Sequence, residues 1–147
     1  MMWNMKPIFI LLTILSLIVP PSPLFAGRDK AKSSGREGYL KKDRLSDDRI
    51  NIHNMDGSKE GYLKQDRLFK DRVYIYDRNG RKKGYLKRDN LFDDQTNYFD
   101  EDGAKKGYLK EDRIFKNRIN IYNENGRQKG YFEKDILFED RTNIYDY

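Results

Sequence analysis

The stretch VYIYDRNGRKKGYL, residues 73–86, predicts two short strands joined by a tight turn. β-Branched and aromatic residues alternate with period two before Asn79-Gly80, and Gly-Tyr-Leu follows, which is the pattern of a β-hairpin. Asn-Gly favours a two-residue type I′ turn, because both central residues of that turn need positive φ. With this pair at the tip, the register that follows pairs Val73 with Leu86, Tyr74 with Tyr85, Ile75 with Gly84, and Tyr76 with Lys83.

Polarity separates between the two faces of this predicted hairpin. Directly opposed residues lie on the same face of a sheet. A slip of one residue would mix aliphatic and polar side chains on both faces, so the pattern itself supports the register. The aliphatic face holds Val73, Ile75 and Leu86, with Gly84 leaving room beside Ile75, and the other face holds Tyr74, Tyr76, Tyr85 and the stem of Lys83.

The hairpin recurs along the chain every 23 residues. Gly-Tyr-Leu-Lys at 84–87 is found again at 38–41, 61–64 and 107–110, and in altered form at 130–133. Such a period is typical of arrays whose units cannot bury their apolar faces alone. We therefore expect an all-β domain of five tandem β-hairpin repeats with about ten short strands, either closed into a ring or barrel or stacked in an open array. The predicted units are 38–60, 61–83, 84–106, 107–129 and 130–147.

The longer connection inside each unit carries an aspartate followed by an apolar pair, such as Asp66 and then Leu68-Phe69. We expect the aspartate to begin a tight turn by accepting backbone N–H bonds. We also expect the apolar pair to fold down over the core, because each unit has few other large apolar side chains to bury. The equivalent residues are Asp43, Asp89, Asp112 and Asp135, and the pairs Leu91-Phe92, Ile114-Phe115 and Leu137-Phe138, with Leu45-Ser46 in the first unit.

Residues 1–26 have the organisation of a secretory signal peptide. Lys6 precedes an apolar run from Ile8 to Val19, and a proline cluster then leads to Ala26. Twelve residues are too few to span a bilayer, which needs about 20. We expect cleavage after Ala26 and export to the periplasm, the cell surface or the medium, with a retained membrane anchor as the alternative. A polar linker, 27–37, precedes the repeats.

Composition narrows the class of protein further. The chain has 30 Lys and Arg against 24 Asp and Glu, a formal net charge of +6. The two signs are interspersed, which indicates a solvated repeat surface, whereas a nucleic-acid arm would carry clustered basic runs. There is no cysteine, so an exported domain of this sequence has to be held together by packing and backbone pairing without disulfides.

The sequence offers no catalytic or metal-binding constellation. The recurring aspartates occupy equivalent positions, whereas glycoside hydrolysis needs two carboxylates in different environments. The segment FDEDG at 99–103 is similar to the start of a calcium loop, but aligning Gly103 with the loop glycine puts Tyr98 and Leu109 where acidic ligands are required. His53 takes the place of an aromatic residue in the other units. We expect no enzyme activity, no cofactor and no metal.

Two surfaces are candidate ligand sites. An aromatic face flanked by polar groups suits sugar rings and extended polymers, and the alternative is that the rings pack against the neighbouring unit and expose only hydroxyls. A basic edge at the turns suits an anionic polymer, with weaker binding at high salt, and the alternative is a solvated turn region. The candidates are Tyr62, Tyr74, Tyr76, Tyr85, Tyr108 and Tyr131 on the face, and Arg81, Lys82, Lys83, Lys105 and Lys106 on the edge.

NYFDEDGAKKGYLK (97–110) and IYDRNGRKKGY (75–85) resemble the Tyr/Phe-Asp-x-x-Gly hairpins of bacterial cell-wall-binding and glucan-binding repeats and of YD-type surface repeats. The short tandem hairpins are also similar to those of small ring-shaped β-flower domains. These resemblances cover most of 38–147 and imply an exported, non-catalytic β-repeat module. The choline- and glucan-binding families use a tryptophan in each unit to bind sugar, and the only tryptophan here is Trp3 in the leader, so that ligand does not follow.

Together these observations predict a non-enzymatic module that binds a cell-envelope or extracellular polymer, either glycan or anionic surface material. The alternative is a structural or protein–protein interaction scaffold without a small-molecule ligand. Nucleic acid is not expected as a partner, because the basic residues alternate with acidic ones.

Overall fold

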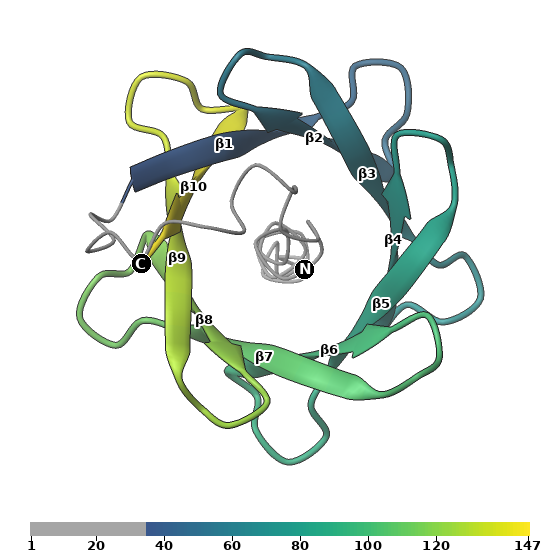
Figure 1. Cartoon of the computed structure of the whole chain (residues 1–147), viewed down its shortest axis with the longest axis vertical. Helices are drawn as coiled ribbons and strands as arrows, with labels where there is room; N and C mark the ends of the chain where they lie inside the picture. Colours follow the sequence, from purple (N-terminus) through teal and green to yellow (C-terminus); the bar gives the residue numbers. More distant parts are fainter. Residues whose placement is uncertain (1–34) are drawn as a thin grey trace, which may run out of the picture.

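The computed structural model describes residues 35–147, which form a closed barrel of antiparallel strands (Figure 1). Each strand pairs with its neighbours in sequence, and the first pairs with the last. The prediction of an all-β repeat domain is confirmed, and of the two arrangements left open the closed one is observed. The strands are β1 (Gly35–Lys42), β2 (Arg49–Asn54), β3 (Lys59–Gln65), β4 (Arg72–Asp77), β5 (Lys82–Arg88), β6 (Gln95–Asp100), β7 (Lys105–Glu111), β8 (Arg118–Asn123), β9 (Gln128–Lys134) and β10 (Arg141–Asp146).

Closure joins the two strands that an open array would leave as edges. Gly38 of β1 lies opposite Ile144 of β10, and Leu40 lies opposite Thr142. An unpaired strand edge is a template for pairing with another chain, and a closed barrel has none. The predicted leader, residues 1–26, lies outside the described residues.

The predicted register is confirmed for the pairs Val73–Leu86, Tyr74–Tyr85 and Ile75–Gly84, but the prediction of a type I′ turn is wrong. A type I′ turn needs positive φ at both Asn79 and Gly80, but within 35–147 only glycines have positive φ, so in this turn Gly80 has it, at 77°, and Asn79 does not. The Gly80 N–H donates to the Asp77 carbonyl at 3.0 Å, and the Asp77 N–H donates to the Arg81 carbonyl at 2.9 Å. This is a three-residue loop in which a left-handed glycine follows a turn centred on Arg78 and Asn79.

The Asp77 side chain explains the preference for this longer loop. Its Oδ1 accepts the backbone N–H groups of Asn79 and Arg81, both at 2.9 Å, and such bonds favour right-handed turn geometry at the central residues. The neighbouring pairs then shift, so that Tyr76 pairs with Lys82 and not with Lys83 as predicted. Equivalent side-chain bonds hold the other three turns, through Asn54, Asp100 and Asn123.

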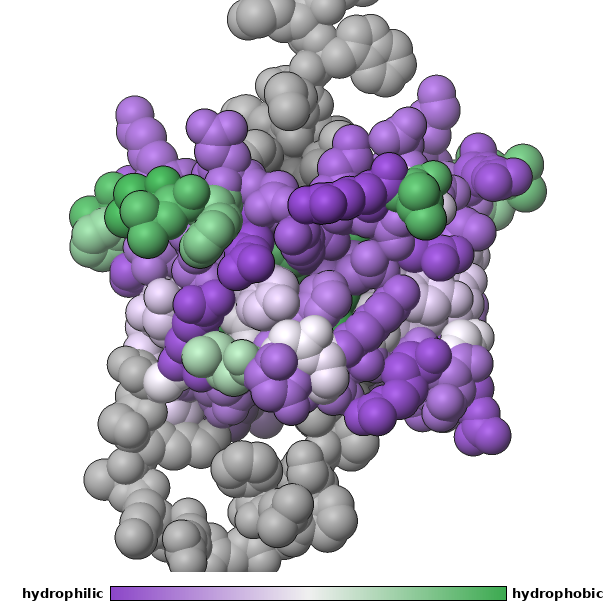
Figure 2. All heavy atoms as spheres, turned by 90° about the horizontal axis from the view of Figure 1, so that it is seen from above, coloured by the Kyte–Doolittle hydropathy of each residue, from purple (hydrophilic) through white to green (hydrophobic). Residues whose placement is uncertain are grey.

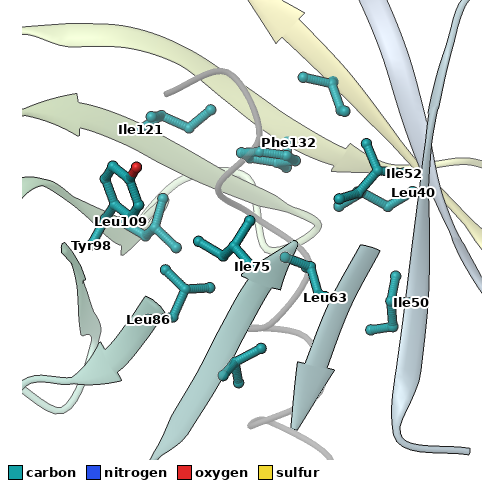
Figure 3. Packing of buried hydrophobic residues seen from close by; sticks show 12 residues of the cluster. Leu40, Ile50, Ile52, Leu63, Ile75, Leu86, Tyr98, Leu109, Ile121 and Phe132 are labelled. Atoms are coloured by element: carbon teal, nitrogen blue, oxygen red, sulfur yellow. The ribbon is translucent and has the colours of Figure 1, made fainter. Parts of the chain in front are cut away.

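The core is formed by the inward faces of the strands, as the alternation predicts. Twelve side chains of this cluster are at most 6% exposed, and Figure 3 shows them converging from all sides of the barrel. Most come from the aliphatic faces of the hairpins, so the polarity of each hairpin decides which side of the wall points inward. The members are Leu40, Ile50, Ile52, Leu63, Val73, Ile75, Leu86, Tyr98, Leu109, Ile121, Phe132 and Ile144.

The two ends of the barrel differ in construction. Because the strands alternate in direction, the five six-residue loops lie at one end, here named the loop end: 43–48, 66–71, 89–94, 112–117 and 135–140. The glycine turns lie at the other, the turn end: 55–58, 78–81, 101–104 and 124–127.

The expectation that the apolar pairs of the loops fold over the core is wrong. Leu68 is 86% exposed and Phe69 is 52% exposed, and Figure 2 shows the most hydrophobic residues gathered along one rim of the barrel. Asp66 begins the turn as predicted, with its Oδ1 accepting the N–H groups of Leu68 at 2.7 Å and Phe69 at 3.1 Å. These bonds, and one from the Arg72 N–H to the Phe69 carbonyl, hold the loop in a tight turn that places the pair at the rim.

Candidate functional site

The predicted tyrosine face forms the outer wall of the barrel, where its rings stack in cross-strand pairs. Tyr62 of β3 lies directly opposite Tyr76 of β4, with ring centroids 4.9 Å apart and planes 14° from parallel. One face of each ring is therefore covered, which is the packing alternative to an open sugar platform. The other four pairs are Tyr39–His53, Tyr85–Phe99, Tyr108–Tyr122 and Tyr131–Tyr145, with centroids 4.7–5.0 Å apart.

An arginine at the start of the preceding strand covers the second face of most of these tyrosines. The Arg49 guanidinium lies 4.4 Å from the Tyr62 ring centroid. Arg118 lies 4.1 Å from Tyr131 and 4.4 Å from Phe115 of its own loop, so its cation is held between two rings. Each such contact is worth about 0.5–2 kcal/mol. Arg72 and Arg141 make the equivalent contacts with Phe69 and Tyr85, and with Phe138 and Tyr39.

We name each stack of an arginine, a tyrosine and its cross-strand partner an aromatic column. A loop phenylalanine extends the columns of Arg72, Arg118 and Arg141, and the column of Arg49 has Ser46 at that position.

Sequence reasoning missed the arginines. The available signal was their recurrence at the first position of the second strand in four units, with Gln95 in the remaining one. Three of these arginines lie over the tyrosine of the strand that follows in the same hairpin, as Arg49 of β2 does over Tyr62 of β3. The contact of Arg141 with Tyr39 depends on the closure of β10 onto β1.

The structure brings the predicted basic edge and the predicted tyrosine face together as one surface. The Lys82 Nζ lies 4.3 Å from the Tyr74 ring centroid and 5.8 Å from that of Tyr85. Lys105 lies 5.6 Å from Tyr108 in the same way. Tyr74 itself meets its neighbours edge-on, with its centroid 6.4 Å from that of Tyr85.

The tyrosine hydroxyls reach the turn end of this surface. A Cβ built on Gly80 would lie 3.7 Å from the Tyr62 hydroxyl oxygen, and one built on Gly103 would lie 3.9 Å from that of Tyr85. Burial raises the pKa of the Tyr76 hydroxyl, with a further contribution from Tyr62. Burial likewise raises the pKa of Tyr131. These hydroxyls are therefore protonated at neutral pH and can both donate and accept hydrogen bonds.

The other three predicted basic residues, Arg81, Lys83 and Lys106, also lie at the turn end. Arg81 and Lys106 are exposed, and Lys83 is half-buried. The Lys106 Nζ lies 3.5 Å from the Asp100 carboxylate, and at such an exposed position this ion pair contributes little to stability. The turn end therefore presents cations beside neutral phenol hydroxyls.

The loop aspartates form a second recurring network. The Asp112 Oδ1 accepts the N–H groups of Ile114 and Phe115 at 2.8 and 2.9 Å, and its Oδ2 accepts the Asn120 amide at 2.8 Å. The Phe115 N–H, the Asn120 amide and the Ile114 N–H hold the pKa of Asp112 below its usual range. The equivalents Asp43, Asp66, Asp89 and Asp135 have lowered pKa values through bonds of the same kind.

We expect acid to destabilise the protein through these aspartates. A pKa that is lower in the folded than in the unfolded chain gives stability that is complete above the unfolded pKa, about 4, and is lost as the pH falls through the folded pKa. Urea unfolding at pH 7, 5, 4 and 3 should show a falling free energy of unfolding below pH 4. Asp112→Asn should make the free energy of unfolding fall less steeply with decreasing pH. A free energy of unfolding that stays constant down to pH 3 would show that these aspartates do not stabilise the fold.

Within residues 35–147 no group of three or more His, Cys, Asp or Glu side chains is placed to hold a metal ion. The same residues contain no helix of the length and hydropathy needed to cross a membrane. Tyr98 is the one core residue with a hydroxyl, and burial raises its pKa to about 12, with the nearby Asp100 adding to the effect.

Comparison with known proteins gives little information on this chain. No protein family matches the sequence, and no curated protein matches it. A protein from Arabidopsis thaliana of known X-ray structure is similar over 76% of this chain and 80% of its own, with a TM-score of 0.47 and 11% sequence identity.

Proposed function

We propose that this protein is an exported, non-enzymatic module that binds a cell-envelope or extracellular polymer, glycan or anionic surface material, on its outer wall and turn end. The observation that carries the proposal is the repetition of one surface around the barrel. Three of the four turn-end hairpins place a lysine over a tyrosine ring, as at Lys82 and Tyr85, and the fourth has Gln128 at the equivalent position. A polymer repeats its own groups at regular intervals and can bind several such copies at once, which raises affinity without new contacts.

The columns restrict how the tyrosines take part. Because stacked partners cover the ring faces of Tyr62 and Tyr85, these residues offer their edges and hydroxyls and not an open aromatic platform. A ligand is then recognised by hydrogen bonds and charge. Anionic groups suit the lysines, and hydroxyl-rich groups suit the phenols. The stacking keeps these groups in fixed positions, which lowers the entropy cost of binding.

Retention on insoluble peptidoglycan and on an immobilised acidic polysaccharide tests the proposal. The double substitution Lys82→Glu with Lys105→Glu should weaken retention at least tenfold, and raising the salt concentration should weaken binding of the unmodified protein. The matched control is Arg113→Glu with Lys116→Glu, which makes the same charge change at the loop end. Equal effects of the two variants, or no retention of the unmodified protein on either polymer, would refute the proposal.

The hydroxyls are tested separately. Tyr85→Phe with Tyr108→Phe keeps the stacked rings and removes only the hydroxyl groups, so the fold should be preserved. Weaker retention on the neutral glycan strands of peptidoglycan is expected from this variant. Unchanged retention would remove the phenols from the proposed site and leave the lysines alone.

One observation favours a second function, the interaction scaffold. The apolar pairs of the loops are exposed at the loop end, and exposed apolar patches of this extent mark interaction surfaces in soluble proteins.

A further inference from the structure

The loop end carries a ring of ten large apolar side chains that are between 48% and 97% exposed. Every one of the five loops contributes to it, because each projects the residues after its aspartate. Polymer binding at the turn end uses none of them. The ring consists of Leu45, Leu68, Phe69, Leu91, Phe92, Ile114, Phe115, Ile136, Leu137 and Phe138.

The apolar area of this ring is that of a stable interface. Its four phenylalanines expose about half of their surface, which at ~150–250 Å² per aromatic residue amounts to roughly 400 Å². The six aliphatic side chains, more fully exposed, add at least as much again. The sum, on the order of 800 Å², is what each partner of a standard protein–protein interface buries.

The acidic and basic residues of the loops are unevenly distributed around the ring. Nine of their twelve acidic residues lie in 43–48, 89–94 and 135–140, and four of their five basic residues lie in 66–71 and 112–117. Going round the barrel in strand order, loops with three acidic residues therefore alternate with loops that hold two basic residues each, except where 135–140 adjoins 43–48. A partner of uniform charge would match only part of this ring.

We propose that the loop end binds the loop end of a second copy of this chain, face to face about a twofold axis. One such axis places 43–48 of each copy opposite 112–117 of the other, and 66–71 of each copy opposite 89–94 of the other. In four of the five contacts a loop with three acidic residues then faces a loop that holds two basic residues. The remaining contact puts 135–140 against itself, and this loop has an extra exposed apolar residue, Ile136. The interface is isologous and closes on itself.

A lipid surface fits the same ring less well. Asp47 and Asp93 are fully exposed beside the apolar residues of their loops, and inserting those residues into a bilayer would bring the carboxylates to the headgroups. The positive side chains near them are engaged, since Lys42 pairs with Asp47 at 3.5 Å and Arg88 with Asp93 at 3.5 Å. In the proposed dimer Asp47 instead faces 112–117, which holds Arg113 and Lys116, so that opposite charges meet.

The proposal goes beyond polymer binding and is independent of it. In the dimer the two turn ends point in opposite directions, so two copies of the polymer surface would be available to one long ligand or to two. Dimerisation at the loop end and polymer binding at the turn end are measured separately. A dimer that does not bind polymer can therefore be distinguished from a monomer that does.

Sedimentation velocity of the full chain over a hundredfold range of concentration tests the proposal. The unmodified protein should form a dimer, and Leu68→Ser with Leu91→Ser should weaken it at least tenfold. Both residues are exposed, so the thermal unfolding of this variant should match that of the unmodified protein at a concentration where both are monomeric. The control is Met55→Ser, at an exposed apolar residue of the turn end, which should leave the dimer intact.

Charge exchange tests the predicted pairing of loops. Asp47→Lys should weaken the dimer, because it places a positive charge opposite Arg113 of the second copy, and Asp47→Lys with Arg113→Glu should restore it. A monomer at every concentration, a dimer indifferent to the leucine substitutions, or no rescue by the charge exchange overturns the proposal. Binding of the monomer to phosphatidylcholine–phosphatidylglycerol vesicles through the same leucines would overturn it in favour of a lipid surface.

Discussion

Replacing Leu63 with alanine is expected to lower the free energy of unfolding by about 2–5 kcal/mol, the range for a buried leucine that leaves a cavity. Leu63 is completely buried and lies opposite Ile50 on one side and Ile75 on the other, in a closed wall that has little freedom to collapse into the gap. The repeats do not protect against this loss, because the five hairpins share one core and unfold together.

Leu68→Ala is the matched control, since the same side chain is removed from an 86% exposed position. It should change the free energy of unfolding by less than about 0.5 kcal/mol. Urea denaturation of both variants, at a concentration where the unmodified protein is monomeric, gives the comparison. Equal losses at the two positions would mean that the loop leucines are part of the core, as the sequence pattern had suggested.

The second large effect is expected from Gly61→Ala. A Cβ at this position would lie 2.2 Å from the Tyr76 carbonyl oxygen of β4, so the two strands would have to move apart. We expect a loss of about 1–3 kcal/mol or more in the free energy of unfolding, the cost of overpacking. The same close approach is found at Gly38, Gly84 and Gly130, so it accounts for the glycine of the recurring Gly-Tyr-Leu-Lys run.

Gly80→Asn separates the steric effect of a new Cβ between two strands, as at Gly61, from the effect of a left-handed backbone conformation. Gly80 has a left-handed φ of 77°, which asparagine tolerates, and a Cβ there would be in ordinary van der Waals contact with the Tyr62 hydroxyl, at 3.7 Å. Its substitution should therefore cost much less than that of Gly61, as measured by thermal and urea unfolding. A larger loss at Gly80 than at Gly61 would show that the turn, and not the approach of the strands, limits stability.

The aromatic columns show where prediction from the sequence stopped. The outward direction of Tyr62 and Tyr76 follows from period-two alternation, because each strand has only two faces. Their stacking on each other, and the position of Arg49 over Tyr62, depend on which strands are adjacent and how they are offset. The sequence therefore identified the individual candidate residues, but it did not predict which side chains cover their ring faces.

By itself the sequence determined the five repeats, the strand pairs, the register from Val73 to Gly84 and the inward aliphatic face, because these follow from local alternation and from Gly-containing turns. Only the tertiary structure decided the closure of β1 onto β10, the exposure of Leu68 and Phe69, and the need for Gly61. Each of these depends on contacts between residues far apart in the chain or on the fixed curvature of the closed wall. A hydrophobic pattern shows which side chains gain from burial, but the space available inside the barrel decides which of them obtain it.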